Sequence, residues 1–322
     1  MSALALRPLG GSTLAITRVG IGTAPIGSSP GWSIDWGPQD ETDALRAIHT
    51  AMDLGINWID TAPFYGWGRA EQLVGRALRG RRDGMLIFTK CGTLPTRSGA
   101  WYENLTPASI RREVEASLRN LQTDYIDLYQ LHDPDPTTPI EESWQAMQAL
   151  IDEGKVRYGG LSNHPVELVE RALAVAPVIA NQHQYNLLNR AIEQSVLPFS
   201  AQHHIGVLAW APLASGFLVD SFDVHRLSAT DFRRRLAYAQ PPAYQQLSQL
   251  RAMLQRIAQR HGRTLRDLAI AWVLRQPSVT GAIIGIRNAY EARAMVEGID
   301  WDLTNDDLAR IEQALAHWRD QS

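Results

Sequence analysis

Cysteine is nearly absent from this sequence, with Cys91 the single residue of its kind among 322. One cysteine cannot form an intramolecular disulfide, which excludes disulfide-stabilised secreted scaffolds and favours a reducing compartment. Long apolar runs are also missing, so the sequence predicts no membrane-spanning helix. The first residues, MSALALRPLGGSTL, lack the apolar core of a signal peptide. Together these absences predict a soluble, cytoplasmic protein.

An excess of positive charge is missing too. The chain has 31 Lys and Arg against 34 Asp and Glu, for a net charge of −3. This balance gives no electrostatic basis for binding nucleic acid. The hydrophobic fraction of 45% is ordinary for a globular protein with a large core. The composition therefore predicts no nucleic-acid partner, and nothing in the sequence specifies an oligomeric state.

Short apolar segments alternate with segments of helical periodicity from residue 19 to the end of the chain. Eight of them are predicted strands: Val19–Thr23, Asn57–Ile59, Met85–Thr89, Ile126–Leu131, Val156–Leu161, Val178–Asn181, Gly206–Ala209 and Gly281–Ile284. The helical segments include Glu41–Leu54, Glu71–Leu78, Pro107–Leu121, Glu141–Glu153, Pro165–Ala174 and Ala191–His203. This alternation, with no break in composition, predicts one α/β domain over residues 1–322, a (β/α)8 TIM barrel.

A doubly wound open sheet would give the same alternation of strands and helices. However, the glycine-rich segment from Gly20 to Gly27 has the wrong spacing for the dinucleotide-binding fingerprint of that fold. Before the first strand, LRPLGGSTLAITR predicts a β-hairpin that plugs the barrel floor. Residues 214–262 exceed the length of one connection, so we predict an extended loop and an extra helix, Tyr244–Gln259, after the seventh strand.

Polar side chains stand at the ends of six successive predicted strands. They are Asp60, Lys90, His132, Ser162-Asn163, Asn181-Gln182 and Trp210. One polar residue at a strand end is ordinary, because Asp, Ser and Asn favour turns. In a barrel, however, the carboxyl ends of the strands meet at one rim, where catalytic groups lie. An acid, an amine, an imidazole, a hydroxyl, amides and an indole at one rim predict an active site.

The segment NWIDTAPFYGWG adds a phenol, Tyr65, five residues after Asp60. Tyrosine titrates near pKa 10, so it needs help to exchange a proton at neutral pH. We expect the ammonium of Lys90 to lower the pKa of Tyr65, and Asp60 to keep Lys90 charged. His132 would donate a hydrogen bond to a carbonyl oxygen or orient the phenol. Such a site moves a proton to or from an oxygen and needs a partner that supplies a hydride.

Several longer segments extend the pattern along the chain: GINWIDTAPFYGWGRAEQLVGRAL (55–78), FTKCG (88–92), DLYQLHDPD (127–135), GGLSNHP (159–165), NQHQYNLLNR (181–190), WAPLASGFL (210–218) and GAIIGIRN (281–288). In order and spacing they resemble the aldo-keto reductases, in particular a bacterial branch that includes sugar- and polyol-active reductases and relatives of potassium-channel β-subunits. The resemblance implies a TIM barrel, a nicotinamide dinucleotide bound without a Rossmann motif, and interconversion of carbonyls and alcohols.

The resemblance also implies roles by position. Asp60, Tyr65, Lys90 and His132 match the catalytic tetrad, with the tyrosine as general acid in reduction and general base in oxidation. Positions that match cofactor-binding residues are Ser162, Asn163 and Gln182 for the nicotinamide carboxamide, Trp210 for stacking on the nicotinamide ring, and Pro212, Leu213, Ser215 and Gly216 for the pyrophosphate.

The adenine side departs from the family pattern. The motif that contains Gly285 continues to Glu291 and Met295, where the family often carries Gln or Arg and then Asn. A carboxylate at Glu291 would repel a 2′-phosphate and favour NAD, whereas Arg287 would bind that phosphate. Arg233, in DFRRR, either clamps the cofactor or is a solvated loop charge. The balance favours NADP(H) over NAD(H).

Three tryptophans, Trp32, Trp67 and Trp101, fall in the loops above the predicted barrel. Apolar walls around a few polar groups suit a substrate pocket, although these side chains could equally pack on the barrel rim. Cys91 directly follows Lys90, so strand alternation points it away from the lysine and predicts a packing role.

The sequence thus predicts an NAD(P)H-dependent oxidoreductase that interconverts aldehydes or ketones and alcohols, with sugars or polyols as candidate substrates. One alternative is a metal-dependent barrel hydrolase that uses His132 with Asp133 or Asp60; no supporting ligands lie at recognised spacing, so no metal is predicted. Another is a nucleotide-binding redox sensor with little or no catalysis. Turnover of small aldehydes and sensitivity to chelators separate the three.

Overall fold

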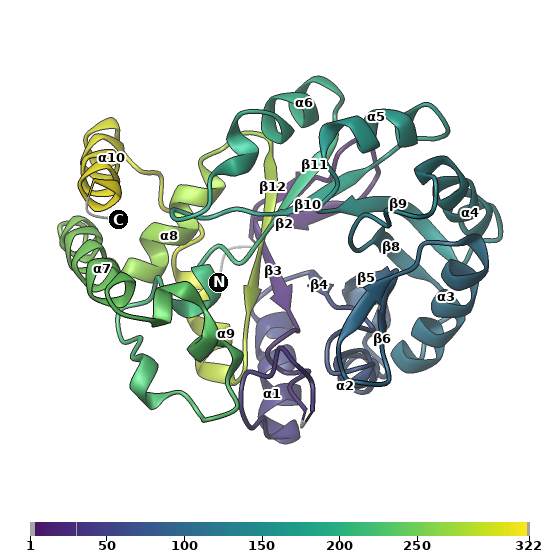
Figure 1. Ribbon diagram of the computed structural model, residues 1–322, viewed down its shortest axis with the longest axis horizontal. Helices are drawn as coiled ribbons and strands as arrows, with labels where there is room; N and C mark the ends of the chain where they lie inside the picture. Colours follow the sequence, from purple (N-terminus) through teal and green to yellow (C-terminus); the bar gives the residue numbers. More distant parts are fainter. Residues whose placement is uncertain (1–3, 30, 321–322) are drawn as a thin grey trace.

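A closed barrel of eight parallel strands forms the centre of the molecule (Figure 1). The computed structural model describes residues 4–29 and 31–320. The strands follow the chain around the barrel: β3 (Val19–Gly22), β4 (Trp58–Asp60), β5 (Leu86–Cys91), β8 (Ile126–Leu131), β9 (Val156–Ser162), β10 (Ala180–Gln184), β11 (Gly206–Trp210) and β12 (Val279–Gly285). The predicted (β/α)8 barrel is confirmed, with strand ends shifted by up to three residues.

Helices cover the outside of the barrel (Figure 1). They are α1 (Glu41–Asp53), α2 (Arg69–Ala77), α3 (Pro107–Leu121), α4 (Ile140–Asp152), α5 (Val166–Leu173), α6 (Val196–Gln202), α7 (Ala243–Gln259), α8 (Leu265–Leu274), α9 (Ala289–Glu297) and α10 (Asn305–Arg319). The predicted extra helix is α7, which packs against α10 at the edge of the molecule. Across residues 4–29 and 31–320, no helix is both long and apolar enough to cross a membrane.

Local sequence sets several helix ends as expected. Thr106 is the N-cap of α3 and Pro107 its first residue, where the missing N–H of proline costs nothing. Gly55 and Gly154 follow α1 and α4 with φ of 93° and 75°. Glycine adopts this left-handed conformation without the steric penalty of a Cβ, so it ends the helix.

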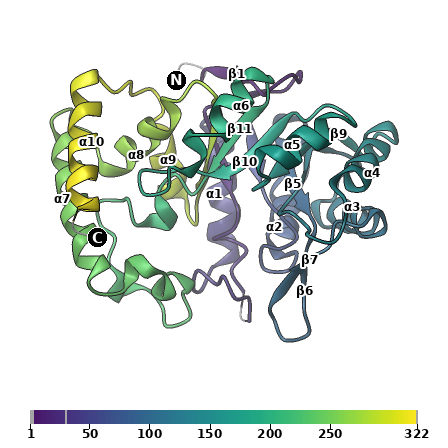
Figure 2. The same cartoon turned by 45° about the horizontal axis from the view of Figure 1, so that its top comes forward.

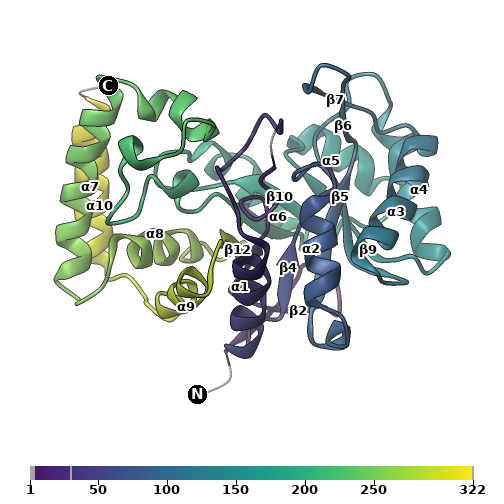
Figure 3. The same ribbon diagram turned by 90° about the horizontal axis from the view of Figure 1, so that it is seen from below.

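Two segments differ from the sequence prediction. Residues 191–203 do not form one helix but a 3-10 turn (Ala191–Glu193) followed by α6. Pro198 explains the break, because a proline is tolerated in the first turn of a helix that begins at Val196 and not in the interior of a longer one. The loop after β5 contains an unpredicted hairpin, β6 (Thr93–Pro95) with β7 (Trp101–Glu103), which projects beyond the barrel (Figures 2 and 3).

The N-terminal hairpin closes the other end of the barrel, as predicted. Its strands, β1 (Leu6–Pro8) and β2 (Ala15–Thr17), pair in antiparallel register. Leu9, Leu14 and Ile16 pack in one buried cluster with Trp58, Phe88 and Leu128 from the barrel strands. The hairpin and the barrel interior therefore share one apolar layer.

Two glycines make room for the largest side chain of this layer. Trp58 is fully buried, and its Nε1 donates to the carbonyl of Thr17 over 2.8 Å. A Cβ on Gly20 would lie 2.1 Å from Cε2 of this indole, and one on Gly281 would lie 2.7 Å from its Cζ2. Neither strand can carry a side chain here while Trp58 keeps its place.

We expect Gly20→Ala to lower the free energy of unfolding by about 2 kcal/mol or more, because overpacking forces the indole or the strand to move. Gly11→Ala is the matched control, since a Cβ there meets no atom within 4 Å. Urea unfolding followed by circular dichroism measures both. Equal midpoints for the two variants would show that the barrel interior adjusts to the extra methyl group.

Candidate active site

An ion pair lies at the centre of the barrel rim. Lys90 in β5 donates to Oδ1 of Asp60, the last residue of β4, over 2.6 Å. The side chains of Lys90 and Asp60 are 0% and 2% exposed. Lys90 Nζ also donates to the Thr61 carbonyl at 2.9 Å and to the Tyr65 hydroxyl at 3.3 Å. All three protons of the ammonium thus have an acceptor.

Two glutamines complete the surroundings of Asp60. Gln182 in β10 donates to Asp60 Oδ2 over 2.8 Å, and Gln130 in β8 donates to the same oxygen over 3.4 Å. The two amides are themselves joined, Nε2 of Gln182 to Oε1 of Gln130, at 3.3 Å. The sequence reasoning missed Gln130. Its register partner in the barrel is Lys90, and this pairing is the signal that would have found it.

The charges of the site follow from burial and from the ion pair. Burial acts to lower the pKa of Lys90, but Asp60 and Tyr65 reverse this, so the pKa of Lys90 is raised and the ammonium persists. Burial raises the pKa of Tyr65 by more than Lys90 lowers it. Lys90 thus acts on the phenol in the expected direction, but burial outweighs it, so the pKa of Tyr65 is raised and the phenol keeps its proton at neutral pH.

His132 follows β8 and lies beside the phenol, with its ring 6.0 Å from that of Tyr65. Burial, and then the charge of Lys90, hold the pKa of His132 well below its usual value. The imidazole is consequently neutral, so it carries one N–H donor and one acceptor nitrogen.

A tight loop between β4 and α2 presents the phenol to the ion pair. Gly66 in this loop has a φ of 63°, and a Cβ there would lie 1.9 Å from the carbonyl oxygen of Gly27. Only glycine fits such an approach, so the chain turns immediately after Tyr65. Asp60 and Tyr65, five residues apart in the sequence, thereby both accept hydrogen bonds from Lys90.

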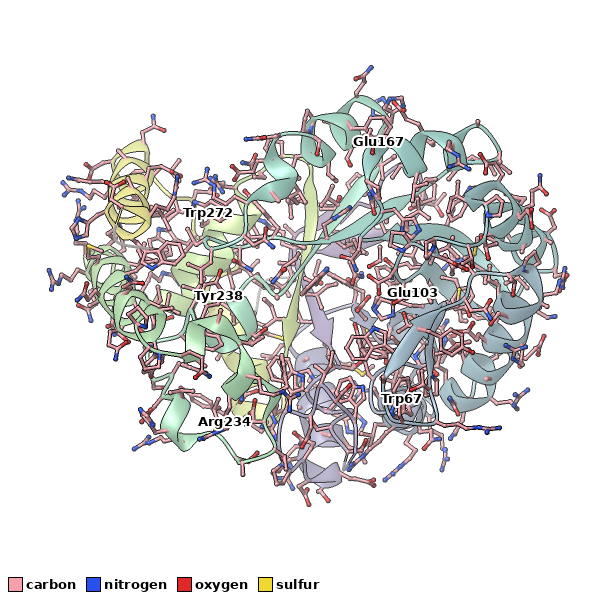
Figure 4. All side chains as sticks on the ribbon, viewed as in Figure 1. Trp67, Glu103, Glu167, Arg234, Tyr238 and Trp272 are labelled. Atoms are coloured by element: carbon pink, nitrogen blue, oxygen red, sulfur yellow. The ribbon has the colours of Figure 1, made fainter. Side chains whose placement is uncertain are left out.

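Aromatic side chains form a wall beside Tyr65. Trp32, Trp67 and Trp101 each contact the ring of Phe64, with centroids 5.6, 5.3 and 5.5 Å away. The three predicted pocket tryptophans are thus brought together, through a phenylalanine that sequence reasoning missed. Trp101 is 42% exposed, whereas Trp32 is buried. Figure 4 places Trp67 on the α2 side of the barrel, away from Arg234 and Tyr238 on the opposite side.

Ser162 and Asn163 lie at the end of β9, and Trp210 lies at the end of β11, with β10 between the two strands. The indole Nε1 of Trp210 donates to Oδ1 of Asn163 over 3.0 Å. Asn163 has a φ of 58° and donates from Nδ2 to the carboxylate of Asp133 over 2.8 Å. The hydroxyl oxygen of Ser162 is buried and has no hydrogen-bond partner in the part of the chain that the structure describes.

The loop after β11 contains four of the predicted cofactor-binding residues, two before Ala214 and two after it. Pro212 follows Ala211, and Leu213, with a φ of −93°, precedes Ala214, with a φ of 47°. A right-handed residue followed by a left-handed one can form a concave arrangement of amides that favours anions. Here the Ala214 N–H donates to the Ala211 carbonyl over 2.9 Å, so the neighbouring amides would supply the donors. Ser215 and Gly216 continue the turn with φ of 57° and 91°.

Arg233 lies against this turn. Its Nη1 donates to the carbonyl of Ser215 over 3.3 Å, and its other nitrogens bind the carboxylate of Asp231 at 2.7 and 2.9 Å. The guanidinium also lies 4.8 Å from the ring of Trp36. The arginine is therefore ordered by the loop rather than a solvated surface charge.

Arg287 and Glu291 lie beyond Gly285, the end of β12. The guanidinium of Arg287 donates to Gln39 Oε1 at 2.9 Å and to the backbone carbonyls of residues 36–38. Glu291 accepts instead from the backbone N–H of Arg287 at 2.8 Å, and burial raises its pKa. Met295, at the second departure from the family pattern, is a buried core residue.

Metal-binding groups were sought over the described ranges, 4–29 and 31–320. No three His, Cys, Asp or Glu side chains gather there in a way that could hold a metal ion. Cys91 is buried in the outer core and its Sγ contacts the carbonyl of Gln130 at 3.7 Å, so it faces away from Lys90.

Comparisons with known proteins agree with this geometry. The model of the Aldo/keto reductase family matches residues 18–316. The aldo-keto reductase YhdN of Bacillus subtilis (strain 168) is 37% identical over 93% of this chain and 90% of its own. The NADH-specific methylglyoxal reductase of Escherichia coli (strain K12) is 32% identical, over 95% and 97%.

Solved structures give the same answer. The glycerol dehydrogenase AKR11B4 from Gluconobacter oxydans superimposes with a TM-score of 0.87 at 34% identity, covering 98% of this chain and 96% of its own. The holo form of the aldo-keto reductase AKR11C1 from Bacillus halodurans gives 0.80 at 30% identity, covering 97% and 96%. The chain belongs to the aldo/keto reductase family, and it is an NAD(P)H-dependent oxidoreductase that interconverts aldehydes or ketones and alcohols by hydride transfer.

Proposed function

We propose that residues 1–322 act as one catalytic domain in which Tyr65 delivers a proton to the carbonyl oxygen during reduction and removes it during oxidation. Lys90 and the neutral His132 stabilise the negative charge that develops on this oxygen. Asp60 keeps Lys90 charged in its buried position. The observation that carries this proposal is the 3.3 Å hydrogen bond from Lys90 Nζ to the protonated phenol of Tyr65.

The nicotinamide cofactor, when bound, supplies the hydride. Ser162 and Asn163 are proposed to hold its carboxamide, and the buried, unpartnered hydroxyl of Ser162 supports this. The amide nitrogen of Gln182 is already used by Asp60 and Gln130, so its carbonyl oxygen is the group left for the carboxamide. Trp210 is proposed to stack on the ring.

The amide concavity at Leu213 and Ala214 would receive the pyrophosphate, with Pro212, Ser215 and Gly216 along it. Gly285 would let the chain pass close to the adenosine. Arg233, which donates a hydrogen bond to the carbonyl of Ser215, would also contact the pyrophosphate.

We expect Tyr65→Phe to lower kcat by about 10²- to 10⁴-fold, the usual worth of a general acid. The ring stays, so the affinity for cofactor should change little. Nicotinamide absorbance measures turnover, and quenching of tryptophan fluorescence measures cofactor binding. Wild-type turnover in this variant would contradict the proton-transfer role of Tyr65.

We propose NADP(H) as the preferred cofactor. Glu291 is turned toward the backbone of Arg287, and within residues 4–29 and 31–320 the guanidinium of Arg287 donates its hydrogen bonds to neutral oxygen atoms, with the Glu291 carboxylate acting on it through charge alone. Its positive charge is consequently left for a 2′-phosphate, which it would bind by a charge-assisted hydrogen bond. One relative carries the name NADH-specific, so the preference is set by local residues rather than by the fold.

We expect Arg287→Gln to weaken NADPH binding by about tenfold or more, the worth of one hydrogen bond to a charged group, and to leave NADH binding nearly unchanged. Glu291→Gln is the control, because Gln keeps an acceptor for the backbone N–H of Arg287. Fluorescence titration of both variants with NADPH and with NADH gives four affinities, which are compared with those of the wild-type protein. An equal loss for both nucleotides would mean that Arg287 only supports the loop of residues 36–39.

Small hydroxylated aldehydes and ketones, or the matching polyols, are the substrates we propose. The polar groups of the pocket, Tyr65 and His132, lie beside an aromatic wall that limits its size. A relative is named for methylglyoxal and a structural neighbour for glycerol, both three-carbon compounds.

We expect kcat/KM to be higher for glyceraldehyde and methylglyoxal than for an unbranched apolar aldehyde of six carbons. Steady-state assays with the tighter-binding nucleotide measure this order. A higher kcat/KM for the six-carbon aldehyde would overturn the proposed substrate class and leave the proton-transfer role of Tyr65 intact.

A further inference from the structure

Asp133, in the loop after β8, has no role in the proton transfer proposed above. Its Oδ1 accepts a hydrogen bond of 2.8 Å from Nδ2 of Asn163. Asn163 in turn accepts from the indole of Trp210 over 3.0 Å. These three side chains come from the ends of β8, β9 and β11, and they form one connected chain that runs from the substrate side of the rim toward the cofactor side.

The chemistry of the two outer groups fixes the amide between them. An ionised carboxylate only accepts hydrogen bonds, and an indole N–H only donates. The nitrogen of Asn163 must therefore face Asp133, and its oxygen must face Trp210. A rotated amide would leave a donor facing a donor and an acceptor facing an acceptor.

The backbone adds a second constraint on Asn163. Its φ of 58° is left-handed, a conformation that asparagine tolerates better than most residues. Its N–H donates to the carbonyl of Gln182 at 2.8 Å, and Nδ2 also reaches the carbonyl of His132 at 3.3 Å. With the backbone held, the side chain responds mainly to Asp133 and Trp210.

We propose that Asp133 is a positioning residue that fixes the amide of Asn163 and, through it, the indole plane of Trp210 against the nicotinamide. This inference rests on the proposed function, because the contacts of Asn163 and Trp210 with cofactor belong to that proposal. Asp133 touches neither the reacting atoms nor the cofactor in this role. Its loss should therefore change cofactor affinity through the orientation of Trp210.

The surroundings of Asp133 make this role dependent on pH. Burial and the charge of Glu103 on β7 raise its pKa, while Asn163 and Lys90 act to lower it, and the result is about 6. Tyr65 and His132 also lie on this side of the rim, and both are neutral at that pH. Above about pH 6 the carboxylate is ionised and holds Asn163; below it, a proton competes for the same oxygen atoms. Cofactor affinity should therefore fall as the pH falls through this value.

Three variants test the proposal. Asp133→Ala removes the acceptor, and Asp133→Asn keeps a neutral acceptor oxygen. Glu103→Gln is the matched control, because it removes a neighbouring carboxylate that is not among the hydrogen-bond partners of Asn163 in the described residues. NADPH is titrated by quenching of tryptophan fluorescence on both sides of pH 6, and kcat and KM are measured at neutral pH. Circular dichroism checks that each variant is folded.

Asp133→Ala should weaken NADPH binding by about tenfold at neutral pH, the loss of one charge-assisted hydrogen bond, and should remove the pH dependence. Asp133→Asn keeps an acceptor oxygen but not the charge, so its affinity should match that of the wild-type protein below pH 6 and should not depend on pH. Glu103→Gln should keep neutral-pH affinity and move the midpoint of the pH dependence downward, because the repulsion that raises the pKa of Asp133 is gone.

Unchanged NADPH affinity in Asp133→Ala at every pH would overturn the inference. An increase in the KM of the carbonyl substrate alone would overturn it too, because Asp133 would then act on substrate. If wild-type protein bound neither nucleotide, the proposed function itself would fail, and that result is distinct from normal wild-type binding with no effect of the variants.

Discussion

The buried pair of Lys90 and Asp60 is the interaction on which the rest of the site depends. Each charge loses several kcal/mol of hydration on burial, and mutual attraction offsets this only if the remaining polar atoms also find partners. They do: the Tyr65 hydroxyl accepts a hydrogen bond from the ammonium, and the amides of Gln182 and Gln130 donate to the second carboxylate oxygen of Asp60. Because Asp60, Lys90, Gln130 and Gln182 come from barrel strands held in fixed register, the hydrogen bonds that join these strands' side chains also arrange the proposed catalytic groups.

The sequence predicts the strand-end groups because each follows an apolar run, and parallel strands bring their carboxyl ends to one rim. Gln130 cannot be identified in this way, because it lies inside an apolar strand and its register with Lys90 is known only from the structure. Phe64 escapes for a similar reason. It reads as a turn residue, and its place among three tryptophans depends on how three separate loops fold over the rim.

Other differences arise from burial, which a sequence does not report. Pairing charges along the chain leads to a lowered pKa for Tyr65, but the loss of hydration outweighs Lys90 and raises it. The adenine side is similar: Glu291 reads as a group facing the cofactor, whereas it caps the backbone beside Arg287. In both places the sequence identifies the residue, and its surroundings in the folded chain change the electrostatics expected of it.

Trp58, which packs between Gly20 and Gly281, determines from which end of the barrel a ligand can approach the active site. With the hairpin it fills the floor of the barrel beneath the ion pair, so a molecule would reach Tyr65 from the side of the loops that follow the strands. On the proposed assignment the nicotinamide would lie at the strand ends and the carbonyl compound beside the aromatic side chains, so both ligands would pass between the same loops.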